Sequence, residues 1–180
     1  MMATWDRRCA QVLLTHENIS HRRHAMNVLR TLEDTLALGV LPVVNENDSV
    51  ATEELRFGDN DRLAASLASL LGADLVILLS DVDALYDRNP QHHETAHPLH
   101  EVYDIDDDVI AMAGDSSSAV GTGGMASKVY AAQVATEGGV PLIVVGGHVP
   151  KVLTRLLSGE VLGTRFQVSA NPRINRRQHW

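Results

Sequence analysis

The residues whose chemistry is easiest to interpret lie between Gly121 and Ala132, in the sequence GTGGMASKVYAA. Glycines at three of the first four positions let the backbone approach a ligand closely. The residues from Met125 onward favour a helix, so unpaired N–H groups and the positive end of a helix dipole meet where the glycines end. With the positive charge of Lys128 nearby, the pattern indicates an anion site, and phosphate is the expected anion.

The glycine segment alone leaves two interpretations open. Glycine-rich stretches before helices are also plain connections. The P-loop pattern has Gly directly before the lysine and Ser or Thr after it, whereas Lys128 lies between Ser127 and Val129. A phosphate site therefore needs support from other parts of the chain.

Two segments rich in Asn and Asp, NEND (45–48) and FGDND (57–61), provide that support. Turn and capping chemistry accounts for such residues in part, and Asp61 could serve partly as a helix N-cap. Two clusters so close together exceed what turns require, which indicates ligand binding. A third segment, SDVDALYDRNP (80–90), has paired Asp residues that could hold a divalent ion or could be surface turn residues.

Other kinds of reactive site are not indicated. The histidines 92, 93, 97 and 100 lie in a Pro-containing stretch without Cys or a clear ligand spacing, so we interpret them as loop residues rather than a zinc site. No Ser-His-Asp or Cys-His arrangement stands out, and Cys9 has no obvious base. An enzyme of this kind would work by positioning and charge, which points to phosphoryl transfer.

The composition bounds the class of protein. The 180 residues are 44% hydrophobic but only 4% aromatic, which predicts one domain with an aliphatic core. A formal charge of −8 argues against a general nucleic-acid or membrane-surface binder. The single cysteine fits a reducing compartment. No apolar run reaches the roughly 18 residues that span a bilayer, and the N-terminus does not resemble a secretory signal, so we expect a cytoplasmic location.

Short aliphatic segments alternate with helical patterns along the chain. Strands are expected at 10–14, 41–44, 75–79, 141–145 and 164–168. Helices are expected at 20–38 (capped by Ser20), 61–71, 106–113, 125–137 and 151–157. The alternation predicts an α/β fold, a mainly parallel sheet with helices on both faces, with strands 41–44 and 75–79 fully buried.

Ligands of open parallel sheets bind at the carboxyl ends of the strands. We therefore expect the polar residues that follow the strands to converge on one edge of the sheet, joined by the glycine segment and Lys128. These residues are Asn45, Asp48, Asp59, Asn60, Asp61, Ser80 and Asp81.

The segment from VVNEND through LRFGDND to LSDVDALYDRNP, followed by GTGGMASK, resembles the glutamate 5-kinases of the amino acid kinase family. The resemblance runs from about Gln11 to the C-terminal end, and the three motifs together are specific. It implies an α/β/α sandwich of the amino acid kinase type. It also implies ATP-dependent phosphorylation of the γ-carboxylate of L-glutamate, the first step of proline biosynthesis.

The resemblance also implies a role for each motif residue. Glutamate would be bound by Asn45, Asp48 and Asn60. Asp59 and Asp61 would organise charge beside the transferring phosphoryl group, and Ser80 and Asp81 would contact the nucleotide. The ATP phosphates would be bound by Thr122, Gly123, Gly124, Met125, Ala126, Ser127 and Lys128. Lys128 would contact the phosphoryl group during its transfer.

The implied chemistry agrees with the residue types. A γ-carboxylate with a pKa of about 4.3 is ionised at pH 7, so it needs no general base. The obstacle is repulsion between two anions, which a lysine and Mg²⁺ relieve. The resemblance further implies proline as a feedback inhibitor acting at the glutamate site and a homo-oligomer, and nothing indicates a nucleic-acid or membrane partner.

The family pattern differs from this sequence before Gln11. Family members begin with a strand and a glycine loop that carries a second phosphate-binding lysine, followed by a Ser-Gly-Ala loop, and many end in a PUA domain. We therefore expect residues 1–180 to be the C-terminal two-thirds of an amino acid kinase domain, incomplete and inactive alone. The alternatives are a sibling kinase acting on acetylglutamate, aspartate, carbamate or UMP, and a non-catalytic glutamate- or proline-binding fragment.

Overall fold

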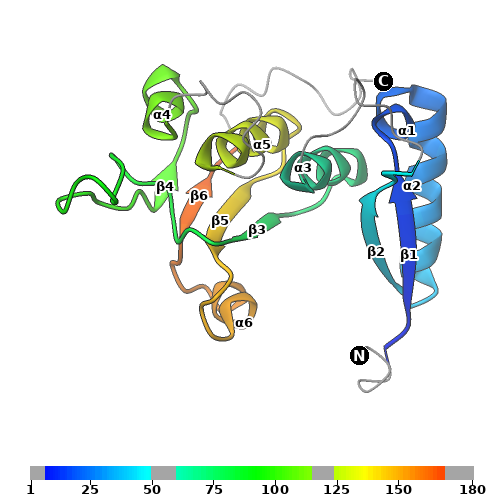
Figure 1. The fold of residues 1–180 in the computed structure, drawn as a ribbon. Coiled ribbons are helices and arrows are strands. Elements are labelled where there is room, and N and C mark those ends of the chain that lie inside the picture. Colours follow the sequence, from blue (N-terminus) through cyan, green and yellow to red (C-terminus); the bar gives the residue numbers. More distant parts are fainter. Residues whose placement is uncertain (1–6, 50–59, 115–123, 169–180) are drawn as a thin grey trace.

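The computed structural model describes residues 7–49, 60–114 and 124–168, and structural statements refer to these residues. The first part is a parallel two-stranded sheet of β1 (Cys9–Leu14) and β2 (Leu41–Glu46), in which Leu14 is opposite Glu46. The helices α1 (His16–Ser20) and α2 (Arg22–Ala37) connect the two strands. α2 runs along one face of this sheet (Figure 1).

The second part is a four-stranded sheet with the order β3-β5-β6-β4. β3 (Val76–Ser80) pairs in parallel with β5 (Leu142–Gly146), and β4 (Glu101–Val102) pairs in parallel with β6 (Thr164–Phe166). β5 and β6 are antiparallel. The α/β class and the mainly parallel pairing are thus confirmed, with β6 as the exception. β4 was not predicted because two residues carry no periodic pattern.

Helices cover both faces of the four-stranded sheet, as predicted (Figure 1). On one side lie α3 (Asn60–Leu71), α4 (Asp107–Met112) and α5 (Met125–Glu137). On the other side lies α6 (Val152–Leu157), whose Val152 packs with Ile143 and Val145 of β5. The carboxyl ends of β3 and β5 therefore lie between helices that can position side chains around them.

α3 connects the two parts through two apolar faces. Leu63, Leu67 and Leu70 belong to the cluster formed with Leu14 and Leu32 of β1 and α2. Its alanines, Ala65 and Ala68, belong to the cluster that contains the small residues of α5, which lets the two helices pack closely. The beginning of α3 is consequently fixed against both β2 and α5.

The expected helix 20–38 agrees with α2 within two residues at each end, but the predicted cap at Ser20 is wrong. A separate short helix, α1, precedes α2 and is divided from it at His21, whose backbone is extended with φ −97° and ψ 119°. Ser20 ends α1 instead of capping the longer helix, and His21 is the N-cap of α2 without a side-chain hydrogen bond. A local cap explains the separate first turn, because Thr15 N donates to Asn18 Oδ1 at 2.8 Å.

The strands 41–44 and 75–79 are not buried on both faces, contrary to the prediction. Leu41 is 48% exposed and Val43 is 47% exposed, because the described helices cover only one face of β1 and β2. Leu79 is 53% exposed near the end of β3, which is one of the two edge strands of its sheet. β2 thus alternates between exposed and half-buried residues, and β3 between buried residues and more open ones.

The remaining element predictions agree with the structure within one or two residues at their ends. The core is aliphatic, as the composition indicated, apart from the fully buried Phe166. In the parts of the chain that the structure describes, no helix is both long and apolar enough to cross a membrane.

Candidate functional site

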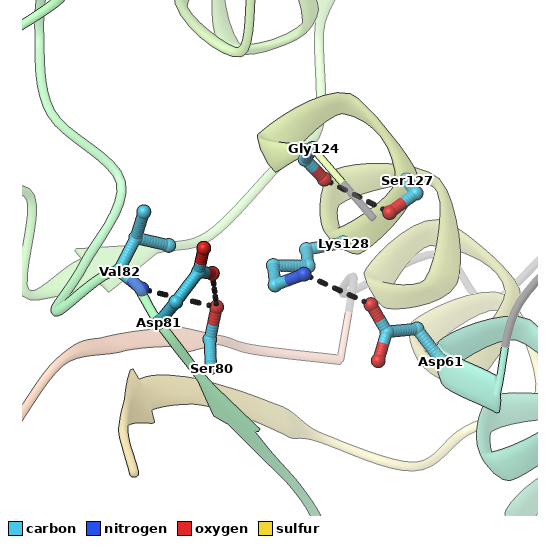
Figure 2. A network of polar contacts seen from close by, with 7 residues as sticks. All are labelled: Asp61, Ser80, Asp81, Val82, Gly124, Ser127 and Lys128. Carbon is cyan, nitrogen blue, oxygen red and sulfur yellow. Dashed lines mark hydrogen bonds and ion pairs between the residues drawn. The ribbon is translucent and has the colours of Figure 1, made fainter. Parts of the chain in front are cut away.

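Lys128 is the centre of the candidate site. It is the fourth residue of α5, yet it is only 6% exposed, which is unusual for a lysine. Its Nζ lies 3.1 Å from Oδ2 of Asp61, in the first turn of α3 (Figure 2). The close packing of α3 against α5 brings these two residues together across the helix pair.

α5 begins directly after the glycine segment, as predicted. Gly124 is the N-cap, and its carbonyl accepts hydrogen bonds from Ser127 N at 3.1 Å and from Ser127 Oγ at 2.8 Å. The preceding amides of Met125 and Ala126 lie at the first positions of the helix, where N–H groups have no partner within the helix. This end of the helix can therefore stabilise an anion near Lys128.

A second acidic side chain follows β3. The Ser80 hydroxyl donates to Asp81 Oδ1 at 3.0 Å, and Val82 N donates to Ser80 Oγ at 3.2 Å (Figure 2). The bond from Ser80 lowers the pKa of Asp81, as do the aspartate's own backbone N–H and the positive charge of Lys128. Asp81 is therefore ionised at neutral pH and within the electrostatic reach of Lys128.

The carboxyl end of β5 supports this arrangement. Gly147 N donates to Ser80 O at 2.7 Å, which joins the residues after β5 to the end of β3. Beyond this bond, His148 Nε2 lies 3.2 Å from Asp83 Oδ1. The segments that follow β3 and β5 are therefore directly bonded to each other.

A cavity of about 280 Å³ opens beside Asp81 and the start of α5. Its walls come from the segment after β3, from the end of α4 and from Met125. The lining residues are Val82, Ala84, Leu85, Tyr86, Arg88, Asn89, Pro90, Gln91, Met112, Ala113, Gly114 and Met125. A mainly apolar cavity with a few polar side chains suits a ring system attached to a charged group.

Sequence reasoning did not identify this cavity as part of the site. The YDRNP residues were interpreted only as a possible ion-binding or turn segment, and Met112 and Ala113 only as the end of a helix. Their contribution depends on the packing of α4 beside the segment 82–91, which no local spacing reveals.

The structure brings together some of the predicted site residues. Lys128 and Asp61 are in contact, Ser80 and Asp81 face them, and Gly124 to Ser127 form the start of α5. Asn60 is exposed as the first residue of α3, beside Asp61. Asp61 is therefore inside the first turn rather than an N-cap. Asp59, Thr122 and Gly123 lie outside the described residues.

The NEND residues are placed less directly. β2 extends to Glu46, so Asn45 is an exposed strand residue, whereas Asp48 is an exposed residue in the turn that follows. Val44 packs against the cluster that contains Leu63, which brings this end of β2 towards the first turn of α3. Within the described residues, no hydrogen bond joins Asn45 or Asp48 to Lys128 or Asp61.

No described group of three or more His, Cys, Asp or Glu side chains is arranged to hold a metal ion. Of the loop histidines, His100 has its ring Nδ1 3.2 Å from Gly163 O, whereas His97 is held through its backbone N–H, which donates to Asp87 Oδ1 at 2.9 Å.

Three features of this site fit an α/β protein that binds phosphate groups. They are a helix that begins directly after a glycine, a buried lysine paired with an aspartate, and a second carboxylate at the end of a parallel strand. The sequence model of the amino acid kinase family matches residues 4–146. The chain belongs to the amino acid kinase family.

Curated relatives agree with this assignment. A glutamate 5-kinase of Desulfotalea psychrophila is 50% identical over 171 residues, which are 95% of this chain and 45% of that protein. A glutamate 5-kinase of Meiothermus ruber is 46% identical over 176 residues, or 98% of this chain and 46% of that protein. The chain thus spans less than half the length of these relatives.

Two solved structures share the fold at low sequence identity. An isopentenyl phosphate kinase has a TM-score of 0.61 at 21% identity, over 92% of this chain and 62% of that chain. A UMP kinase from Bacillus anthracis has a TM-score of 0.59 at 15% identity, over 94% of this chain and 62% of that chain. These likenesses confirm the α/β architecture with helices on both faces.

Proposed function

We propose that this chain contributes the nucleotide site and part of the acceptor site of a glutamate 5-kinase, which transfers the γ-phosphoryl group of ATP to the γ-carboxylate of L-glutamate. The observation that carries this proposal is the buried Lys128, which is held by Asp61, faces Asp81 and lies in the first turn of α5. The glutamate 5-kinases that are 50% and 46% identical to the chain favour glutamate as acceptor.

The nucleotide would occupy the cavity beside Asp81. Its base would contact the walls near Tyr86 and Pro90, and its phosphates would extend to the amides of Met125 and Ala126 at the start of α5. Thr122, Gly123, Gly124 and Ser127 would complete this phosphate-binding segment. Lys128 is then positioned to stabilise the negative charge of the phosphoryl group as it transfers.

Asp61 has a positioning role in this proposal. Its carboxylate holds the Lys128 ammonium at 3.1 Å and places a negative charge beside a buried cation. The γ-carboxylate of glutamate is already ionised at neutral pH, so Asp61 need not act as a base. Asp59 is proposed to organise charge beside the transferring phosphoryl group, as the family resemblance implies.

The described residues are compatible with Mg²⁺ bound together with ATP. Mg²⁺ is usually bound by one or two carboxylates and the phosphates of a substrate, and Asp81 offers an ionised carboxylate beside the cavity. The cation would neutralise phosphate charge during transfer. This donor set also agrees with the lack of a larger ligand group among the described side chains.

Glutamate would be recognised by the residues near the end of β2. Asp48 suits the α-ammonium group, and the amides of Asn45 and Asn60 suit carboxylates. Proline carries the same α-carboxylate and an amine, so we propose that it competes at this site as a feedback inhibitor. The apolar exposed face of β1 and β2 supports a homo-oligomer, and we propose a cytoplasmic location.

Two experiments test the function. The first titrates the chain with Mg-ATP by calorimetry, and saturable binding that is lost in Lys128→Ala is expected. The second replaces the matched 171 residues of the Desulfotalea psychrophila glutamate 5-kinase with this chain and measures ADP formation. The hybrid should use glutamate and not acetylglutamate, aspartate, carbamate or UMP. If a folded hybrid phosphorylates another acceptor faster than glutamate, the proposed acceptor is wrong and that compound takes its place.

A further inference from the structure

The cavity wall after β3 forms an irregular hairpin. Its first half, residues 85–87, runs antiparallel to residues 97–99, with Tyr86 paired to Pro98 and Asp87 N donating to His97 O at 3.0 Å. At the base of this hairpin, Leu99 N donates to Leu85 O at 2.8 Å. The reciprocal backbone bond, from Leu85 N to Leu99 O, is replaced by a side chain.

That side chain belongs to Thr164, the first residue of β6, which is completely buried. Its Oγ1 accepts a hydrogen bond from Leu85 N at 2.8 Å and donates one to Leu99 O at 2.6 Å. A single hydroxyl group therefore completes the hairpin ladder and attaches the hairpin to the four-stranded sheet. Both backbone groups would be unsatisfied without it.

The position of this bond links it to the cavity. Leu85 is 1% exposed and lines the cavity together with its neighbours Ala84 and Tyr86. A shift of Leu85 would therefore move three consecutive residues of the wall. Thr164 does not line the cavity, so its influence on a bound molecule would pass through the backbone of Leu85.

We propose that Thr164 is a positioning residue for nucleotide binding, which fixes the wall formed by residues 84–86 through its bridging hydroxyl. This inference rests on the proposed binding of ATP in the cavity. A hydroxyl is required because the group must both accept and donate, and a methyl group of the same size does neither. Leaving a buried backbone group without a partner costs more free energy than a typical hydrogen bond contributes. Without the hydroxyl, residues 84–86 would therefore shift until Leu85 N and Leu99 O form other hydrogen bonds.

The test compares four variants of the chain. Thr164→Val removes both hydrogen bonds at constant shape, Thr164→Cys retains a weak donor and acceptor, and Thr164→Ser retains the hydroxyl. The matched control is Thr136→Val in α5, because Thr136 is also buried and its hydroxyl donates to Ala132 O within its own helix. Each variant is titrated with Mg-ATP by calorimetry, and amide exchange at Leu85 and the melting temperature are measured in parallel.

Thr164→Val should weaken Mg-ATP binding on the order of tenfold, the ratio expected when buried backbone groups lose their partners. Amide exchange at Leu85 should accelerate in the same variant. Thr164→Ser should restore both properties, and Thr136→Val should bind Mg-ATP as the wild type does. If Thr164→Val does not fold at the assay temperature, Thr164→Cys carries the comparison with an intermediate loss of affinity.

Three results would overturn the inference. Unchanged Mg-ATP affinity in Thr164→Val with faster exchange at Leu85 would show that the wall does not determine binding. An equal loss in Thr136→Val would attribute the effect to general destabilisation. No binding by the wild type would overturn the proposed nucleotide site and this inference together, whereas the first two results leave the nucleotide site intact.

Discussion

Lys128 on α5 and Asp61 on α3 form an ion pair at 3.1 Å although the lysine side chain is almost entirely buried. The Asp61 side chain is 23% exposed, so its carboxylate is partly hydrated. Burial of the lysine ammonium carries a desolvation cost, which the opposite charge of Asp61 offsets in part. The pair thus connects the stability of the α3–α5 contact with the position of the cation that the proposed reaction requires.

Asp61→Asn should consequently destabilise the fold. The substitution preserves the side-chain shape but removes the negative charge opposite Lys128, and the free energy of unfolding should fall by about 1–2 kcal/mol, less than for a fully buried pair. Urea unfolding monitored by circular dichroism measures the change. Asp74→Asn is the control, because Asp74 is exposed. Equal stability of the two variants would contradict the structural role of the pair.

Lys128 should be required for catalysis in the hybrid glutamate 5-kinase. Lys128→Ala should lower kcat on the order of a hundredfold or more, comparable to the removal of other charge-stabilising donors. Lys128→Arg should also be poor, because a planar guanidinium does not reproduce a compact ammonium. Steady-state kinetics at saturating ATP and glutamate measures both effects, and near-normal kcat in Lys128→Ala would exclude the phosphoryl role.

Ser80 should control the ionisation of Asp81. The pKa of Asp81 is lowered first by the Ser80 hydroxyl, so Ser80→Ala should raise it towards the ordinary value for aspartate. A depressed folded-state pKa stabilises the fold above the unfolded pKa, and this contribution is lost as the pH falls through the folded pKa. Ser80→Ala should therefore reduce the pH dependence of stability in the acidic range.

NMR titration of the Asp81 carboxyl carbon checks the direction of this change. Ser127→Ala is a suitable control, because the Ser127 hydroxyl donates to Gly124 O rather than to Asp81. If the Asp81 carboxyl titrated identically in the wild type and in Ser80→Ala, the hydrogen bond from Ser80 to Asp81 would not influence the pKa of Asp81.

Asp48 tests the proposed acceptor site. It is exposed in the turn after β2, where a carboxylate can pair with the α-ammonium group of glutamate. In the hybrid enzyme, Asp48→Asn should raise KM for glutamate far more than KM for ATP, because the amide keeps the shape but loses the charge. Equal changes in the two KM values would remove this assignment.

Local patterns predicted most of the fold. The glycine segment and the helix-favouring residues after it located α5 from Met125 to Glu137, and the expected helix 61–71 agrees with α3 within one residue. The short helix α1 was missed because its five residues include a single apolar side chain, Ile19, and the polar residues 20–24 (SHRRH) that follow show no apolar spacing. The exposure of Val43 and Leu79 was also missed, since a run of apolar residues does not show which faces are covered.

The site was predictable in its residue types but not in its connections. Lys128 and Asp61 were both candidates, but they are 67 positions apart in the sequence. Their pairing depends on how α3 packs against α5, which the sequence pattern does not show. Thr164 carried no signal, because a threonine in a strand is ordinary and its role comes from two distant backbone groups. The pairing of Asp83 with His148 likewise requires that β3 and β5 be neighbours.

Gly146, at the end of β5, offers a way to test that last pair. A Cβ at this position would collide with the Asp83 carboxylate and lie 2.8 Å from His148 Cε1, so an alanine must push the two side chains apart. Gly147 is the matched control, since a Cβ there would lie no closer than 3.4 Å to any atom and neither glycine has a positive φ. The two substitutions thus differ mainly in their effect on the ion pair.

Asp83 is flanked by Val82 and Ala84, which both line the cavity, so its attachment to His148 supports the wall from outside. Gly146→Ala should weaken Mg-ATP binding by about two- to fivefold, since the pair is exposed, whereas Gly147→Ala should bind as the wild type does. Calorimetry in an Asp83→Ala background, which removes both the carboxylate and its collision with the added Cβ, completes the test, because Gly146→Ala should have no further effect once the pair is gone. A full additional loss in that background would show that Gly146 acts through the strand itself and not through the pair.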